Sequence, residues 1–325
     1  MKGGTAVAFI KKLLTVAALA VLFAAMPATA QDMNTCKQCH QDKVDGMART
    51  LHGKSGLSGS PAATQGCQSC HGDASAHVKA SGGTKVGLVR FSDKTASADT
   101  KSEKCLTCHG ANRQFAYWES GKHKVQDVTC ADCHNIHGTY KGAKINSILT
   151  TSIVPNQSET CFTCHKTIRS DANKPSHHPI VEGKIKCSDC HNPHGAPGKG
   201  MIKTDSVNQL CTTCHAEKRG PFIWEHPPVE ENCLTCHFPH GSNTTKLLVE
   251  KMPHLCADCH EGTRHPTTLY GAGGAITPNS SAAATTAANA GRANNTRMFA
   301  RSCMNCHNEI HGSNGQAYQG RRFFR

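Results

Sequence analysis

Hydrophobic residues gather near the start of the chain and become sparse after it. A lysine-containing start precedes an apolar run of about 14 residues at positions 13–26, which is shorter than the roughly 20 residues that a membrane-spanning helix needs. The small-x-small pattern Ala28-Thr29-Ala30 follows, and signal peptidase cleaves such patterns. The alternative is a retained membrane anchor. We expect residues 1–30 to be a cleaved export signal, so that the mature chain begins at Gln31.

From residue 31 onward, few stretches carry a long helical or strand period. The segments between the cysteine clusters are polar and rich in Gly and Pro, which favours turns and loops. We expect short helices at the cysteine clusters, much irregular chain and little or no β-structure. Residues 271–300 are rich in Ala, Thr, Asn and Gly, which predicts a low-complexity surface loop.

The composition leaves little material for an ordinary hydrophobic core. Of 325 residues, 37% are hydrophobic and 5% are aromatic, and part of the hydrophobic fraction lies in the expected signal. Ordinary domains contain about 45–50% apolar residues when glycine is counted. Something other than Leu, Ile and Phe side chains must therefore fill the interior.

All 20 cysteines fall in ten C-x-x-C-H motifs, which are the attachment signature of c-type haem. One copy alone is compatible with a redox dithiol or with half a zinc site, but ten copies without a spare cysteine are not. The predicted cofactor is haem c, ten per chain, held through Cys36, Cys39, Cys67, Cys70, Cys105, Cys108, Cys130, Cys133, Cys161, Cys164, Cys187, Cys190, Cys211, Cys214, Cys233, Cys236, Cys256, Cys259, Cys303 and Cys306.

The spacing of the motif suits a haem. Two cysteines three residues apart share one face of a helical turn, so both can form thioethers to the vinyl groups on one haem edge. The histidine directly after the second cysteine then brings a neutral imidazole under the ring as the fifth iron ligand. The predicted proximal ligands are His40, His71, His109, His134, His165, His191, His215, His237, His260 and His307.

The sixth ligand separates an electron carrier from an enzyme, because an open iron can bind substrate. The chain has 22 histidines, so 12 remain after the proximal ten. Motifs and spare histidines alternate along the chain, which leaves out only His177 and His254. The predicted sixth ligands are His52, His77, His123, His137, His178, His194, His226, His240, His265 and His311.

The same alternation predicts a linear array of five two-haem modules with loops of different lengths, inside a decahaem domain at residues 31–325. Three predicted sixth ligands, His137, His194 and His240, lie only three residues beyond a proximal histidine. Three residues are too few to reach the other haem face, so these imidazoles are expected to bind the iron of a neighbouring haem. The modules span about residues 36–77, 105–137, 161–194, 211–240 and 256–311.

Of the adjacent histidines 177 and 178, only one can serve as an iron ligand, because consecutive side chains of an extended chain point to opposite sides. Pro179 favours an extended conformation at His178, and His226 and His265 also precede Pro. We therefore choose His178 as the ligand and expect His177 to be a spare.

The formal net charge of +13 does not predict nucleic-acid binding. Removal of the signal takes away three lysines, which leaves +10 (13 − 3). Because each of the ten haems brings two propionates, up to 20 negative charges are added, and the net charge of the holoprotein is expected to be as low as about −10. The chain also lacks the interleaving of aromatic and basic residues that single-strand binders use.

Several stretches carry a family resemblance beyond the haem motif itself. Residues 187–195 read Cys-Ser-Asp-Cys-His-Asn-Pro-His-Gly, and residues 214–221 read Cys-His-Ala-Glu-Lys-Arg-Gly-Pro. Together with residues 224–227 and 239–242, they resemble the periplasmic decahaem cytochromes of the MtrA/DmsE type, which belong to porin–cytochrome electron conduits. The resemblance covers residues 36–312, with a lead-in before Cys36 that is shorter than in the metal-reducing members.

This resemblance implies bis-histidine haems in an extended chain and a periplasmic location associated with the outer membrane. It also implies three kinds of partner: an outer-membrane β-barrel porin, an extracellular multihaem cytochrome or reductase, and a periplasmic or inner-membrane cytochrome donor. Contacts made by the short lead-in are not carried over.

The favoured function is electron transfer without catalytic residues. The alternatives are a multihaem oxidoreductase, such as a nitrite, hydroxylamine or sulfur-oxyanion reductase, and a freely diffusing periplasmic shuttle. Such enzymes need an open iron, often marked by a C-x-x-C-K motif, and none occurs in this chain. Outward flow to metal oxides or dimethyl sulfoxide and inward flow from ferrous iron would use the same haems.

Overall fold

The computed structural model describes most of the region that carries the haem motifs. The described residues are 33–137, 157–260, 303–305 and 307–315. The expected signal at residues 1–30, the low-complexity stretch at 271–300, His265 and Cys306 lie outside them. The chain divides into two compact units, which consist of residues 1–115 with 123–154 and of residues 116–122 with 155–325.

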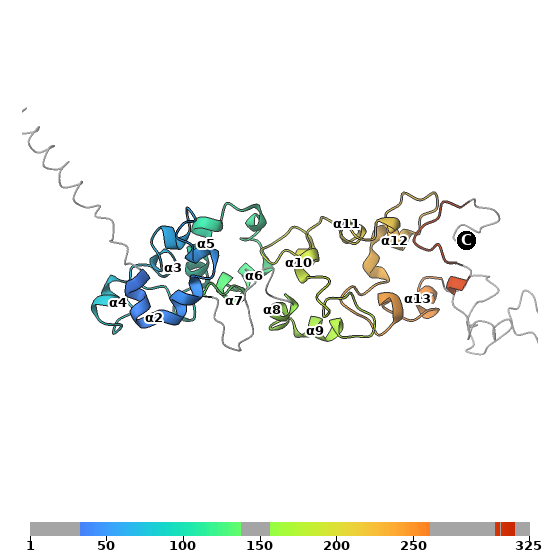
Figure 1. Ribbon diagram of the computed structural model, residues 1–325. Helices are drawn as coiled ribbons and strands as arrows, with labels where there is room; N and C mark the ends of the chain where they lie inside the picture. The colour runs from blue at the N-terminus through green and yellow to red at the C-terminus, as the bar shows by residue number, and fades with distance from the viewer. Residues whose placement is uncertain (1–32, 138–156, 261–302, 306, 316–325) are drawn as a thin grey trace, which may run out of the picture. The chain divides into compact units, whose positions relative to one another are not determined.

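Short helices joined by irregular chain make up the described part of the first unit (Figure 1). Its two longer helices, α2 and α5, each contain a C-x-x-C-H motif. The α-helices are α2 (Met33–Met47), α3 (Gln68–His71), α4 (Ser75–Lys79), α5 (Ala98–His109), α6 (Lys122–Val125), which begins at the unit boundary, and α7 (Cys130–Cys133). Single 3-10 turns are η1 (Leu51–Gly53), η2 (Pro61–Ala63) and η3 (Arg113–Phe115).

The second unit has the same character, with helices of seven residues or fewer in its described part. Its α-helices are α8 (Ser158–Phe162), α9 (Lys166–Ala172), α10 (Cys187–Cys190), α11 (Val207–Thr212), α12 (Pro227–Glu231) and α13 (His254–Ala257). Its 3-10 turns are η4 (Lys199–Met201), η5 (Ala216–Lys218), η6 (Cys233–Thr235), η7 (Thr245–Leu247) and η10 (Cys303–Asn305).

No β-strand forms among the described residues, and four isolated antiparallel bridges are the only sheet-like pairings there. The expectation of short helices, irregular chain and little β-structure is confirmed. None of the helices in the described ranges is long and apolar enough to cross a membrane.

A recurring backbone hydrogen bond explains why the motifs lie on helical turns. In eight motifs the N–H of the proximal histidine donates to the carbonyl of the first cysteine, four residues back, at 2.8–3.1 Å. This bond closes one turn of α-helix, which brings both cysteines and the histidine to one side of the backbone. The local fold therefore prepares the geometry that covalent haem attachment needs.

Apolar side chains are buried sparsely. Nine hydrophobic residues of the described part are buried, and one cluster joins Phe162, Ala172 and Ile180, with Ile168 and Ile185 packed against it. At about 1.5–3 kcal/mol for each buried side chain, nine residues offset little of the backbone ordering cost of roughly 1–2 kcal/mol per residue. The chain therefore needs another source of apolar contact, as its composition predicts.

Candidate haem-binding sites

Seven pairs of histidine rings, called facing pairs below, lie at a nearly constant separation of 5.9–6.3 Å between ring centroids. The ring planes are nearly parallel in four pairs (12–21°), tilted by 46° in one and nearly perpendicular (70–71°) in two. A metal–imidazole bond of about 2 Å places a ring centroid roughly 3 Å from the metal, so two rings on opposite sides of one iron stand about 6 Å apart. The spacing fits one iron in each pair. With the predicted proximal residue first, the pairs are His40–His77, His71–His137, His109–His52, His191–His240, His215–His178, His237–His311 and His260–His226.

Each pair joins one predicted proximal histidine to one predicted sixth ligand, but seldom within one expected module. Only His77 faces a motif of its own module, the one at His40. Three predicted sixth ligands that follow even-numbered motifs, His137, His240 and His311, face the motif two places earlier. Distal histidines that follow odd-numbered motifs face the motif two places later, as His178 faces His215. Six of the seven facing pairs therefore join histidines of two different expected modules.

Of the predicted ligands outside these pairs, five are described. His123, His134, His165 and His194 are all described, and each contacts other groups of the protein. His123 lies on α6, and His134 directly follows α7. His307 closes the turn of the tenth motif, and His265 lies outside the described residues.

The backbone leaves odd-numbered and even-numbered motifs in different directions. In three odd motifs the proximal histidine lies between two helical turns, with φ/ψ of −122°/44° at His40, −85°/62° at His165 and −99°/54° at His215. In two even motifs it is extended, with φ/ψ of −107°/123° at His134 and −108°/146° at His191. All five odd proximal histidines are exposed, whereas all five even ones are half-buried.

A returning loop explains the burial of the even proximal histidines. In three even motifs the ring Nδ1 of the proximal histidine lies 2.9–3.0 Å from a backbone carbonyl farther along the chain. A carbonyl only accepts, so the imidazole carries its proton on Nδ1 and leaves the Nε2 lone pair for iron. Such a bond fixes the ring orientation and raises ligand basicity. The three donor–acceptor pairs are His71–Val89, His191–Gly200 and His237–Lys246.

Two distal rings are held in the same way. Nδ1 of His77 donates to the carbonyl of Thr84, and Nδ1 of His178 donates to the carbonyl of Pro239, each at 2.7 Å. Five predicted ligands in the described ranges thus have Nδ1 committed to a carbonyl. The sequence could not indicate these acceptors, because a backbone carbonyl is present at every residue.

Burial also favours the neutral ring that iron binding requires. It is the largest cause lowering the pKa of seven predicted ligands, and for several of them the facing histidine lowers the pKa further. At His237 the Lys246 carbonyl partly opposes the effect of burial. The seven are His52, His134, His137, His226, His237, His240 and His311.

His177 and His178 point to different surroundings. His178 faces His215, whereas His177 places Nε2 2.9 Å from Oε1 of Glu182 and Nδ1 on the carbonyl of Lys174. The Glu182 carboxylate raises the pKa of His177, which favours an ion pair at the surface. His254, the other histidine outside the alternation, begins α13, and no described ring faces it.

The cysteines of successive motifs also meet. The first cysteines of motifs one and two, three and four, and so on, lie close enough together for each pair to shift the pKa of at least one of its thiols. The second cysteines link the second motif to the third and the eighth to the ninth. Burial is the largest cause raising the pKa of Cys70 and of Cys236, and the nearby thiols of Cys108 and Cys259, respectively, raise it further. Attachment points therefore follow one another in chain order within each unit. The five pairs are Cys36–Cys67, Cys105–Cys130, Cys161–Cys187, Cys211–Cys233 and Cys256–Cys303.

Side-chain amides that the sequence analysis did not single out position these motifs. Asn208 on α11 accepts a hydrogen bond at 2.9 Å from the N–H of Cys233, which ties the seventh motif to the eighth. Asn135 and Asn192, each directly after a proximal histidine, accept the N–H of the distal histidine two residues on. The repeated His-Asn-x-His pattern is the only sequence signal for this role.

Comparison with known proteins places these features in a family. A model of the doubled C-x-x-C-H motif matches residues 177–220 and 226–265, and a model of NrfB-like c-type cytochromes matches residues 67–152. The multihaem cytochrome MtrA of Shewanella baltica is 35% identical over 283 residues, which cover 86% of this chain and 78% of that protein. The polyhaem cytochrome OmcB of Geobacter sulfurreducens is 25% identical over 261 residues, which cover 73% of this chain and 29% of OmcB.

Helical C-x-x-C-H turns, facing imidazoles and these matches define a multihaem c-type cytochrome, a protein that transfers electrons. The chain belongs to the MtrA family of multihaem cytochromes. Covalently bound haem c is thereby confirmed as its cofactor and electron transfer as its activity.

Proposed function

We propose that this protein is a periplasmic electron relay in which two histidines close every haem iron, and that it passes electrons between periplasmic or inner-membrane cytochromes and an outer-membrane conduit. The observation that carries the proposal is the ring separation of 5.9–6.3 Å in seven histidine pairs. When bound, haem iron supplies a one-electron ferric/ferrous couple. An iron with imidazole on both sides has no position for a substrate, so the residues favour electron exchange over catalysis.

Seven of the ten haems take their axial ligands from the facing pairs. The remaining proximal ligands are His134, His165 and His307. The remaining sixth ligands, His123, His194 and His265, complete the set of ten. Every cysteine of the ten motifs forms a thioether in this proposal, and no residue is assigned a catalytic role.

Chain order supports the use of the haems as a relay. The sulfurs of successive motifs lie together within each unit, so each haem-attachment point has the next one as its neighbour. In the odd motifs the second cysteine is exposed, whereas in the described even motifs it is half-buried. The odd attachment points are therefore accessible to a redox partner or to the wall of an enclosing barrel.

The proposed partners follow from similarity to MtrA over 86% of the chain. They are an outer-membrane β-barrel porin, an extracellular multihaem cytochrome or reductase, and a periplasmic or inner-membrane cytochrome donor. The protein would then lie in the periplasm at the inner face of the outer membrane.

Affinity purification of the tagged holoprotein from detergent-solubilised outer membranes tests the conduit. We expect a β-barrel protein to co-elute at a fixed ratio and to retain the cytochrome after washing in high salt. Recovery of all the cytochrome from the periplasmic fraction without a barrel protein would instead favour a diffusing shuttle.

A further inference from the structure

Two loops in the second unit each place a backbone carbonyl on Nδ1 of a predicted proximal histidine, but they are stabilised by different residues. The first strap, residues 198–203, follows the sixth motif, and the second strap, residues 244–249, follows the eighth. Each strap pairs with its motif through two backbone hydrogen bonds. In the first, Asn192 N–H donates to Met201 O and Lys203 N–H to Cys190 O, and in the second, Phe238 N–H donates to Leu247 O and Val249 N–H to Cys236 O.

In each strap one carbonyl is turned onto the proximal imidazole by a residue with positive φ. Gly200 does this in the first strap with φ +71°, and Lys246 does it in the second with φ +60°. The next residue also has positive φ in both straps, +58° at Met201 and +58° at Leu247, so the straps differ only at the first position. Glycine adopts this conformation freely, whereas the Cβ of a lysine resists it. The second strap therefore needs additional contacts to keep the Lys246 carbonyl in place.

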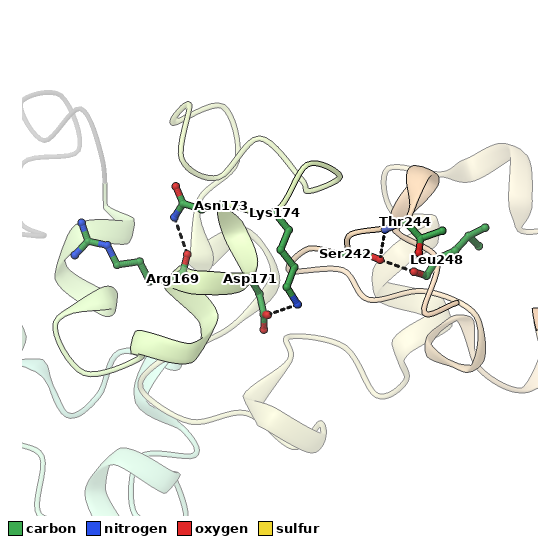
Figure 2. A network of polar contacts seen from close by, with 7 residues as sticks. All are labelled: Arg169, Asp171, Asn173, Lys174, Ser242, Thr244 and Leu248. Atoms are coloured by element: carbon green, nitrogen blue, oxygen red, sulfur yellow. Dashed lines mark hydrogen bonds and ion pairs between the residues drawn. The ribbon is translucent and has the colours of Figure 1, made fainter. Parts of the chain in front are cut away.

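Two serine hydroxyls supply these contacts. The hydroxyl of Ser242, a residue only 4% exposed, donates to the carbonyl of Leu248 and accepts the N–H of Thr244 at 2.9 Å, as Figure 2 shows. The hydroxyl of Ser176 accepts the N–H of Leu247 at 2.9 Å. The two serines also pair through their backbones in both directions, at 3.1 and 2.7 Å. The strap is thus hydrogen-bonded to serine hydroxyls at Thr244, Leu247 and Leu248.

The first strap has neither hydroxyl. The residue equivalent to Ser242 is Ala196, because each directly follows a His-Gly pair. The residue equivalent to Ser176 is Gly121, because each lies two residues before a predicted sixth ligand, His178 and His123 respectively. A Cβ on Gly121 would lie 3.2 Å from the Cα of Gly195, so these two segments also lie against each other. Hydroxyl anchors therefore occur in the strap that lacks the permissive glycine and are missing where the glycine is present.

We propose that Ser176 and Ser242 are positioning residues that hold the Lys246 carbonyl on His237 and thereby tune the haem attached at Cys233 and Cys236. This inference rests on the proposed role of His237 as an iron ligand. The carbonyl makes the imidazole more basic, and a more basic ligand favours ferric over ferrous iron. The clamp thus keeps the reduction potential of this one haem low.

Ser242→Ala in the holoprotein tests the clamp, because alanine keeps the backbone pairing with Ser176 and removes only the hydroxyl. An EPR-monitored redox titration should show a tenfold change in the ferric/ferrous ratio of one haem toward ferrous iron, a rise of about 59 mV for a one-electron couple. The other haems and the haem count should not change. Ser97→Ala is the matched control, since it removes an exposed serine hydroxyl that caps α5 in the other unit.

Rescue separates tuning from general damage. Lys246→Gly removes the strain at residue 246 and gives the second strap the glycine that the first strap has, so Ser242→Ala combined with Lys246→Gly should return the ferric/ferrous ratio to within twofold of the wild-type ratio. If Ser242→Ala alone does not accumulate, the double variant should restore the holoprotein, and its failure would overturn the proposal. A lower melting temperature without a shift in potential, or an equal shift in Ser97→Ala, would also overturn it.

Failure of the underlying ligand assignment would look different. His237→Ala should create one high-spin haem in an otherwise wild-type protein. If every iron stayed low-spin in that variant, His237 would not be a ligand. If His237→Ala behaved as expected and Ser242→Ala shifted nothing, only the clamp would be wrong.

Discussion

Odd-numbered and even-numbered motifs place the same five-residue pattern in two backbone settings. At His165 and His215 the chain turns from one helix directly into the next, and the histidine remains exposed. At His191 and His237 the chain leaves the motif and returns as a strap that bonds to the imidazole, and the histidine is half-buried. Identical attachment chemistry is thus combined with different surroundings.

The difference shows how a chain with few apolar side chains can give its haem sites distinct environments. The odd motifs leave a cysteine and a histidine accessible, which suits contact with partners. Three even motifs hold the predicted ligand with a returning backbone carbonyl, which suits a fixed ring orientation and an altered potential. Both settings depend on a haem to join segments that make few side-chain contacts of their own.

Haem removal should therefore have the largest effect and should erase the difference between the two settings. We expect the mature chain to remain unfolded in a strain that lacks cytochrome c maturation, because sparse apolar burial cannot offset backbone ordering. Far-UV circular dichroism and protease sensitivity of the purified apoprotein measure this. A compact apoprotein with native helix content would contradict it.

Removal of one distal histidine of each class should affect one iron in ten. His178→Ala should open the iron at His215, an odd site, and His240→Ala should open the iron at His191, an even site. Each variant should acquire one high-spin haem that binds carbon monoxide when reduced, as optical and EPR spectra would detect.

The matched control for His178→Ala is His177→Ala, which removes the adjacent ring. Because His177 contacts Glu182 and the Lys174 carbonyl, its loss should leave all haem spectra unchanged, and the same holds for His254→Ala. An open iron in His177→Ala together with unchanged spectra in His178→Ala would reverse the assignment at this pair.

Two glycines associated with even motifs should differ in their tolerance of alanine. A Cβ on Gly241 would lie 1.9 Å from the backbone oxygen of Asp171, which belongs to the α9 segment drawn in Figure 2, whereas a Cβ on Gly200 would meet nothing within 4 Å. Gly241→Ala should therefore destabilise the holoprotein by about 2–4 kcal/mol through overpacking and strain. Gly200→Ala should cost about 1–2 kcal/mol from positive φ alone.

Thermal unfolding of the two glycine variants, followed at the haem absorption bands, provides the comparison. The melting temperature should fall more for Gly241→Ala than for Gly200→Ala. Equal or reversed losses would mean that the close approach of residue 241 to α9 is not maintained in solution.

The local features of this protein could be predicted from its sequence because they depend on local chemistry. Ten C-x-x-C-H motifs dictate haem attachment, and the Gly- and Pro-rich segments between them predict irregular chain. The facing partner of a histidine such as His311 could not be predicted in this way. Its ring meets His237, 74 residues earlier (311 − 237), and that choice depends on how the intervening loops fold.

The straps were beyond prediction for a different reason. Gly200 hints at a turn, but Lys246 occupies the equivalent position with no sequence signal for positive φ. One anchoring serine, Ser242, follows His-Gly in the pattern His240-Gly241-Ser242, which recurs as His311-Gly312-Ser313. Residue type alone cannot distinguish such a buried hydroxyl from an ordinary surface serine.

EPR spectroscopy of the fully oxidised holoprotein tests the central claim, closure of every iron by two histidines, most directly. The intact mass of the same sample should equal residues 31–325 plus ten haems. The number of haems per chain is then known, and the EPR signal can be expressed as spins per haem. We predict ten low-spin ferric haems and no sizeable high-spin signal. A high-spin signal equivalent to one or more haems per chain would contradict the claim and would favour an enzyme with an open iron.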